Sequence, residues 1–256
     1  MSSNIVGYNK INMTTATAST IGYTMIGVSF QQVGGDPLDI NTLFDDAFVA
    51  SLTGGYGTSD SDTIMVWNNG GYTTYYYSAA DWSEEAGDGE ADAYKNNKWL
   101  TIRDELATID FEPGSAAWFC RAKGATKAIT GIMSGEVPTG TKTVEIAAGD
   151  YAMIASATPA TFDLNNSGID WAQAGVLGGY GTSDSDTIQV WDGTGYATYY
   201  FSAADWSEEA GDGEEDAYKD NKWLTIRDEL VSTPIDICKG FWFKRNGETK
   251  LTLTLP

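Results

Sequence analysis

The chain has 256 residues, of which 42% are hydrophobic and 12% aromatic, so the composition supports a packed core and excludes general disorder. Asp and Glu number 36 against 15 Lys and Arg, and the formal net charge of −21 makes nucleic acid and anionic lipid poor partners. Histidine is absent, which removes the commonest general base and metal ligand. No apolar run is long enough for membrane insertion as a helix.

An internal repeat dominates the sequence. Residues 54–106 and 178–230, offset by 124, are identical at 45 of 53 positions. Weaker similarity extends outward, since Ile5–Met13 resembles Ile129–Val137. A repeat of this strength predicts a tandem duplication, with a first β domain over residues 1–133 and a second over residues 134–256.

Within each copy the residue patterns predict strands. Thr63–Trp67 and Tyr72–Tyr77 flank a turn at residues 68–71 and predict a hairpin, which the second copy repeats around Asp192–Gly195. Further strands are predicted around Trp118, at Thr143–Ile146 and at Leu251–Leu255, and short helices at Leu43–Leu52 and Ile169–Leu177. The predicted fold is all-β, with two tandem homologous β-sandwich or barrel-like domains that each carry a short helical insertion.

Short motifs before and after the hairpin recur in both copies. They are Gly22–Ile26 and Pro113–Phe119 in the first copy, and Gly149–Ile154 and Lys239–Phe243 in the second, where the proline is missing. This pattern resembles tandem all-β modules of surface proteins from environmental bacteria. The resemblance implies a module for display or assembly and does not imply an enzyme. We therefore expect an extracellular or cell-surface location, although the first residues show no pattern of a signal peptide.

The negative charge is concentrated in the repeated segments. Residues 54–106 hold ten acidic and three basic residues, and residues 178–230 hold thirteen and three. Calcium takes six to eight oxygen ligands, glycines let a loop wrap around it, and an extended loop would place Asp88, Glu90 and Asp92 on one side. The candidate ligands are Asp60, Asp62, Asp81, Glu84, Asp88, Glu90, Asp92, Asp184, Asp186, Asp205, Glu208, Asp212, Glu214 and Asp216. The alternative is a solvated acidic surface without a bound metal.

Four tryptophan pairs recur in register: Trp67 and Trp191, Trp82 and Trp206, Trp99 and Trp223, and Trp118 and Trp242. We expect Trp67, Trp99 and Trp118 to fill the core. The run Tyr72–Tyr77 has aromatic residues on both strand faces, so it contributes either to the core or to a surface for sugars or proteins. Cys120 and Cys238 lie at unlike positions of the two copies, and we expect free buried thiols.

These observations favour a non-enzymatic structural protein. The N-terminal and C-terminal strand segments suggest that one chain's end meets the next chain's start, in a head-to-tail contact that produces a filament, tube or surface layer. Calcium would stabilise this homopolymer. The alternative function is a bivalent carbohydrate-binding module, lectin-like, in which both copies present equivalent aromatic and acidic sites to a glycan.

Overall fold

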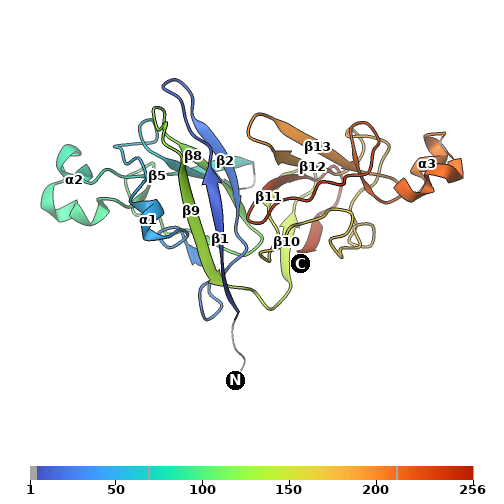
Figure 1. The fold of residues 1–256 in the computed structure, drawn as a ribbon, viewed down its shortest axis with the longest axis horizontal. Helices are drawn as coiled ribbons and strands as arrows, with labels where there is room; N and C mark the ends of the chain where they lie inside the picture. The colour runs from blue at the N-terminus through green and yellow to red at the C-terminus, as the bar shows by residue number, and fades with distance from the viewer. Residues whose placement is uncertain (1–4, 69, 212, 256) are drawn as a thin grey trace.

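Two five-stranded antiparallel sheets form the body of the protein (Figure 1). A computed structural model describes residues 5–68, 70–211 and 213–255, and the fold is mostly β. In spatial order, the first sheet contains β2 (Gly22–Gly27), β8 (Ala116–Arg121), β4 (Thr63–Asn68), β5 (Gly71–Tyr77) and β6 (Trp99–Thr101). The second contains β11 (Tyr151–Ile154), β15 (Phe241–Lys244), β12 (Thr187–Trp191), β13 (Tyr196–Phe201) and β14 (Trp223–Thr225). Corresponding strands of the repeat therefore occupy corresponding places.

Both predicted hairpins are confirmed. Strand β4 pairs with β5 from Thr63 opposite Tyr76 to Asn68 opposite Gly71. Strand β12 pairs with β13 around the turn that begins at Asp192. These segments are rich in β-branched and aromatic residues, which favour strands, and their burial increases away from the turn, towards the start of β4 and the end of β5.

A two-stranded ribbon packs over each sheet. The first ribbon pairs β1 (Val6–Met13) with β9 (Ile129–Glu136), and the second pairs β10 (Lys142–Ile146) with β16 (Leu251–Leu255). The inward side chains of the first ribbon, including Ile11 and Met133, join Ile64 and Phe119 in one core. The second ribbon contributes Leu251 and Leu253 to a separate core with Ile188 and Phe243. A minor pair, β3 (Leu38–Asp39) with β7 (Asp110–Phe111), lies beside the first core.

The terminal strands already have partners within the chain. The sequence suggested that the first and last strands would complete each other between molecules, but β1 pairs with β9 over eight positions and β16 with β10 over five. Within the chain, the residues that resemble the chain start, Ile129–Glu136, form the partner of β1, so a contact between molecules would have to use the other edges of the terminal strands, and it stays a prediction. Each terminal strand nevertheless pairs along only one of its edges within the described chain.

The helices differ from the prediction. The expected helix at Leu43–Leu52 is limited to α1 (Asp46–Val49), and residues 169–177 form turns, so the second helix was predicted wrongly. The Asp170 side chain accepts a hydrogen bond from Gln173 N, and Gly175 has a positive φ, both typical of a turn. Short helices lie in the acidic segments: α2 (Trp82–Glu85), η1 (Gly89–Lys95), α3 (Trp206–Glu209) and η2 (Gly213–Lys219).

The two sheets contact each other through residues that are equivalent in the repeat. Gly27 N donates to Cys238 O at 2.7 Å, and the corresponding Ala155 N donates to Gly114 O at 2.9 Å. The rings of Trp118 and Trp191 meet edge to face with centroids 5.7 Å apart, and Trp67 and Trp242 do the same at 5.3 Å. Contacts that exchange equivalent residues indicate an approximate two-fold relation between the sheets. No helix of the described chain is long and apolar enough to cross a membrane.

Candidate functional site

The two acidic helical segments lie at opposite ends of the molecule, where Figure 1 shows α2 and α3. Next to α2, the Tyr56 hydroxyl donates to Asp81 at 2.9 Å and the Tyr56 N–H donates to Asp60 at 3.1 Å. The hydrogen bond to Asp81 is the main cause of the raised pKa of Tyr56. The second copy repeats this arrangement, with Tyr180 bonded to Asp205 and to Asp184. Four of the predicted ligands thus lie in two matching surface clusters.

The rest of the acidic segment does not have the extended geometry that the sequence suggested. Residues 89–95 form a 3₁₀ helix, so Asp88, Glu90 and Asp92 do not alternate along a strand, and Asp92 pairs with Lys95 at 2.9 Å. Asp216 pairs with Lys219 at 2.8 Å in the second copy. The side chains of Glu84, Asp88, Glu90 and Glu208 are exposed. Asp212 and the side chain of Glu214 lie outside the described residues.

Within the described parts of the chain, no group of three or more acidic or thiol side chains is placed to hold a metal ion. The Asp60 and Asp184 clusters contain carboxylates that are exposed, and a cation would reach them without disturbing the core. Calcium binding therefore stays a prediction that rests on charge density.

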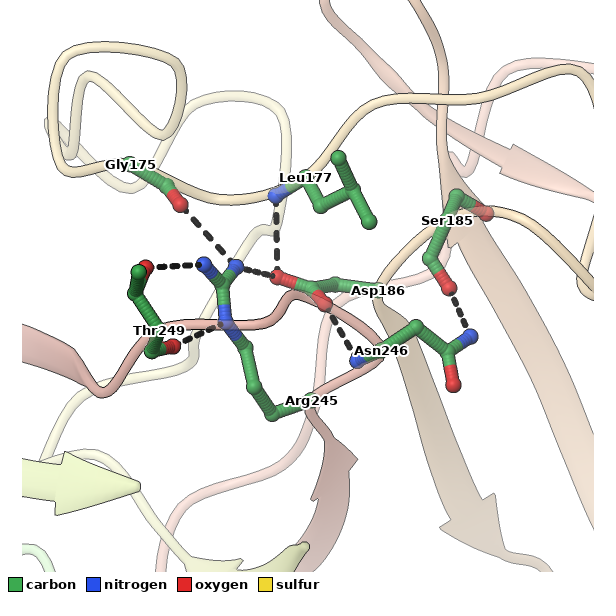
Figure 2. Close-up of polar contacts among 7 residues, drawn as sticks. All are labelled: Gly175, Leu177, Ser185, Asp186, Arg245, Asn246 and Thr249. Atoms are coloured by element: carbon green, nitrogen blue, oxygen red, sulfur yellow. Dashed lines mark hydrogen bonds and ion pairs between the residues drawn. The ribbon is translucent and has the colours of Figure 1, made fainter. Parts of the chain in front are cut away.

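Asp62 and Asp186, also predicted as metal ligands, are buried partners of arginine. Figure 2 shows Asp186 between the Arg245 guanidinium and the N–H groups of Leu177 and Asn246, which donate at 2.9 and 2.7 Å. Asp62 pairs with Arg121 at 2.6 Å and accepts from Thr53 N and Ala122 N at 2.8 Å. Both aspartates are 0% exposed, and these bonds occupy their oxygens. Asp62 thereby joins the start of β4 to the end of β8, and Asp186 joins the start of β12 to the end of β15.

The recurrent tryptophans divide into two groups. Trp82, Trp99, Trp206 and Trp223 are buried within one half of the molecule. Trp118 and Trp242 are buried between the sheets, with Trp67 and Trp191 packed against them. The prediction of a core role for Trp99 is confirmed, while Trp67 and Trp118 form the contact between the halves. Of the Tyr72–Tyr77 run, Tyr76 and Tyr77 are buried and Tyr72 is 45% exposed.

Cys120 and Cys238 are free and buried, as expected. Burial raises the pKa of the Cys120 thiol to about 12, so this thiol stays protonated at neutral pH. Burial also raises the pKa of the Cys238 thiol, so burial disfavours the reactive thiolate form of both cysteines.

The outer face of the first ribbon differs from the rest of the surface. Val6 and Tyr8 are 62% and 70% exposed, and Ile5 beside them is 68% exposed. The other exposed side chains of this face, which we call the ribbon face, are Lys10, Asn12, Thr130 and Ser134. Glu136, the acidic residue of β9, is buried and accepts a hydrogen bond from Gly34 N. The ribbon face is therefore apolar to weakly cationic on a protein with a net charge of −21.

The sequence reasoning missed the ribbon face, although signals for it were present. The first acidic residue of the chain is Asp36, and apolar residues occupy the alternate positions 6 and 8 of a strand. Arg121 and Arg245 were also missed, because only their burial beside an aspartate separates them from surface arginines.

The edges of the two ribbons differ in whether they are bonded to other parts of the chain. The outer edge of β9 is bonded to Gln31 and to Asp45. Strand β1 has no strand along its outer edge in the described chain, and the same holds for β16. Such edges present unpaired backbone donors and acceptors to another chain.

A scan against protein-family models and searches of curated proteins and of solved structures gave no match for this chain.

Proposed function

We propose that this chain is a non-enzymatic structural protein that self-associates through the ribbon face and the outer edge of β1. The observation that carries the proposal is a strand with exposed Val6 and Tyr8 and no acidic residue, on a strongly acidic protein. Elsewhere, like charges repel two approaching copies, so this face offers the least repulsion to a second chain. Exposed apolar strands with an open edge are natural sites of association between chains.

A head-to-tail arrangement follows from pairing the β1 edge of one chain with the β16 edge of the next. The two edges belong to different ribbons, so the contact is heterologous and continues into a filament, tube or layer. The assembling unit consists of two tandem β-sandwich domains. Because β9 pairs with β1 up to Glu136, we place the boundary after that residue instead of at residue 133. The proposed location is extracellular or at the cell surface.

Adding negative charge to the ribbon face tests this proposal. Val6→Asp combined with Tyr8→Asp places carboxylates where two chains would meet, and we expect association to weaken by about 100-fold or more, because like charges in a contact cost several kcal/mol. Sedimentation velocity and negative-stain microscopy measure the change. Deleting residues 1–13 would be a poorer test, because Ile11 and Met13 are buried in the first core.

The chain offers a matched control for these substitutions. Ile102 and Ile226 are exposed by 71% and 69%, similar to Val6 and Tyr8, but lie after β6 and β14. Ile102→Asp combined with Ile226→Asp should leave assembly unchanged. Equal assembly by all three proteins, or a natural chain that remains monomeric at every concentration, would contradict the proposal.

The calcium part of the proposal concerns the charge at the two ends. Chelation at low ionic strength should reduce particle size, and Ca²⁺ should restore it at an ionic strength where NaCl does not. Calorimetry should then show heat on addition of Ca²⁺ to chelated protein. If NaCl of equal ionic strength restores assembly as well as Ca²⁺ does, charge screening suffices and the calcium site is refuted.

A second candidate function is bivalent glycan binding. It is favoured by the two matching clusters at the ends, where Tyr56 and Tyr180 are 49% and 50% exposed and each donates to an aspartate. Two equivalent sites would give avidity for a polymeric glycan. A glycan array with monodisperse protein would support this function over assembly.

A further inference from the structure

A cleft lies where the two halves of the chain meet. Its volume is about 240 Å³, and its walls include Lys10 and Asn12 of β1, Tyr23 of β2, Trp191 and Asp192 of the second hairpin, and Asp236. These residues come from both halves, so neither half forms the cleft by itself. The cleft is separate from the start of β1, where Ile5, Val6 and Tyr8 carry the proposed assembly contact.

At the corresponding place on the other side of the contact, the equivalent polar groups have partners within the chain. There, Trp67 Nε1 donates to Tyr151 O at 2.9 Å, and Glu112, the repeat equivalent of Asp236, pairs with Lys142 at 3.4 Å. In the cleft, Trp191 Nε1 has no hydrogen-bond partner in the described chain. No ion pair of the described residues includes Asp236. The duplicated surfaces have thus diverged: Trp191 Nε1 and Asp236 lack the hydrogen bond and the ion pair that their counterparts Trp67 and Glu112 make within the described chain.

The backbone of the cleft wall is also unusual. Cys238 has a φ of +56°, whereas its repeat equivalent is Gly114 with a φ of +92°. A non-glycine residue in this conformation is strained, and strain of this kind is concentrated at ligand sites. Cys238 lies between Asp236 and Lys239 in the sequence, and Lys239 N donates to Asp236 O at 3.2 Å, so this turn places both charged residues at the cleft.

The side chains of the cleft combine aromatic rings with balanced charges. Tyr23 and Trp191 supply rings, Asp192 and Asp236 supply acceptors, and Lys10 and Lys239 supply donors. The turn N–H groups of Thr194 and Gly195 lower the pKa of Asp192, which keeps its carboxylate ionised. The charges balance, so a neutral ligand with several hydroxyl groups would match both donors and acceptors, while a ring face would pack on the aromatic residues.

We propose that this cleft binds one neutral sugar ring. Drug-sized ligands occupy pockets of roughly 300–1,000 Å³, so the smaller volume of this cleft suits a single pyranose or furanose. An adjoining cavity of about 260 Å³ shares Tyr23 and Trp191 and adds Tyr72 and Tyr196, which gives a second ring of an oligosaccharide an aromatic surface. Lys10 and Asn12 belong to both the ribbon face and this cleft, whereas Ile5, Val6, Tyr8 and the two end clusters lie outside the cleft.

The test measures binding of methyl glycosides of glucose, galactose, mannose and N-acetylglucosamine, and of disaccharides of the same sugars, to the full chain. Calorimetry should give one sugar per chain, with a Kd on the order of 1 mM for the monosaccharide that binds and a tighter value for its disaccharide. Tryptophan fluorescence should change on binding, since Trp191 lines the cleft.

Matched variants locate the site. Asp236→Ala and Lys10→Ala should each weaken binding by at least tenfold, whereas Glu112→Ala, at the repeat equivalent of Asp236, should leave it unchanged. All three side chains lie at the surface, so near-UV circular dichroism should report an unchanged fold. The measurement is repeated with the Val6→Asp and Tyr8→Asp variant, so that sugar binding is judged independently of assembly. Absence of binding to every sugar, two sugars per chain, or equal effects of Asp236→Ala and Glu112→Ala would each overturn the proposal.

Discussion

Replacing Arg245 by methionine is expected to lower the free energy of unfolding by about 3–5 kcal/mol, the range for removing one partner of a buried ion pair. Arg245 is paired with Asp186, whose side chain is 0% exposed. Without the guanidinium, a carboxylate would remain buried and uncompensated. Such a charge costs several kcal/mol, even though Leu177 N and Asn246 N would still donate to the Asp186 carboxylate.

The bonds around Arg245 explain why this position should be among the most sensitive in the chain. Its Nε donates to Thr249 O and its Nη1 to Gly175 O, both at 3.0 Å (Figure 2). The side chain therefore joins three segments: the start of β12 through Asp186, the turn before it, and the turn between β15 and β16. In the first copy, Arg121 pairs with Asp62, but its Nε has no partner in the described chain. Arg121→Met should consequently cost no more than Arg245→Met.

Urea denaturation followed by circular dichroism measures the effect. The control is the double variant Arg245→Met with Asp186→Leu, which removes both charges and should recover a large part of the loss. Two results would contradict this account. The first is a free energy of unfolding for Arg245→Met equal to that of the natural chain. The second is a double variant that is a further 3–5 kcal/mol less stable than Arg245→Met, about as much as the first substitution costs.

Adding one methyl group at Gly240 is expected to destabilise the contact between the two halves. A Cβ at this position would lie 2.6 Å from Ala116 Cβ and 2.9 Å from Ile26 O, and the backbone must shift to relieve both contacts. Overpacking of this kind costs about 1–3 kcal/mol. Gly27, which faces Ala155 at the same contact, should behave similarly.

Thermal unfolding of Gly240→Ala, monitored by tryptophan fluorescence, measures this change, because Trp118, Trp242 and their partners lie at the contact. The matched control is Gly71→Ala in β5, where a Cβ meets no atom within 4 Å. That variant should be neutral or slightly more stable, since alanine restricts the unfolded chain. If both variants unfold at the same temperature, the close approach of the halves does not limit stability.

Much of the fold could be predicted from the sequence because the relevant signals are local. Runs of β-branched and aromatic residues on either side of turn residues located the hairpins of both copies. Alternation located β10 and β16, and the turn at residues 112–114 indicated the strand β8 that follows it. The helix at residues 169–177 was mispredicted, because an apolar spacing of three and four residues does not show that Asp170 and Gly175 close turns there. The pairing of β1 with β9 joins positions more than 100 residues apart, and no local pattern specifies such a partner.

The candidate sites were harder to predict for a different reason. The sequence alone does not distinguish an aspartate that binds a cation from one that pairs with an arginine. The structure shows that Asp62 and Asp186 are buried and paired with Arg121 and Arg245. The interface cleft depends on how two halves are placed, so its residues, such as Lys10 and Asp236, are scattered along the chain. The ribbon face was predictable in principle, since the first 35 residues contain no acid.

Site-directed cross-linking tests the central proposal of head-to-tail assembly most directly. Tyr8 on β1 and Thr254 on β16 are exposed, and the natural cysteines are buried. A chain carrying both Tyr8→Cys and Thr254→Cys should, on mild oxidation, form a ladder of linked chains that extends beyond dimers. The single variants should not form a ladder. Absence of cross-links in the double variant, or linked dimers alone through Tyr8→Cys, would contradict a head-to-tail contact between these two strands.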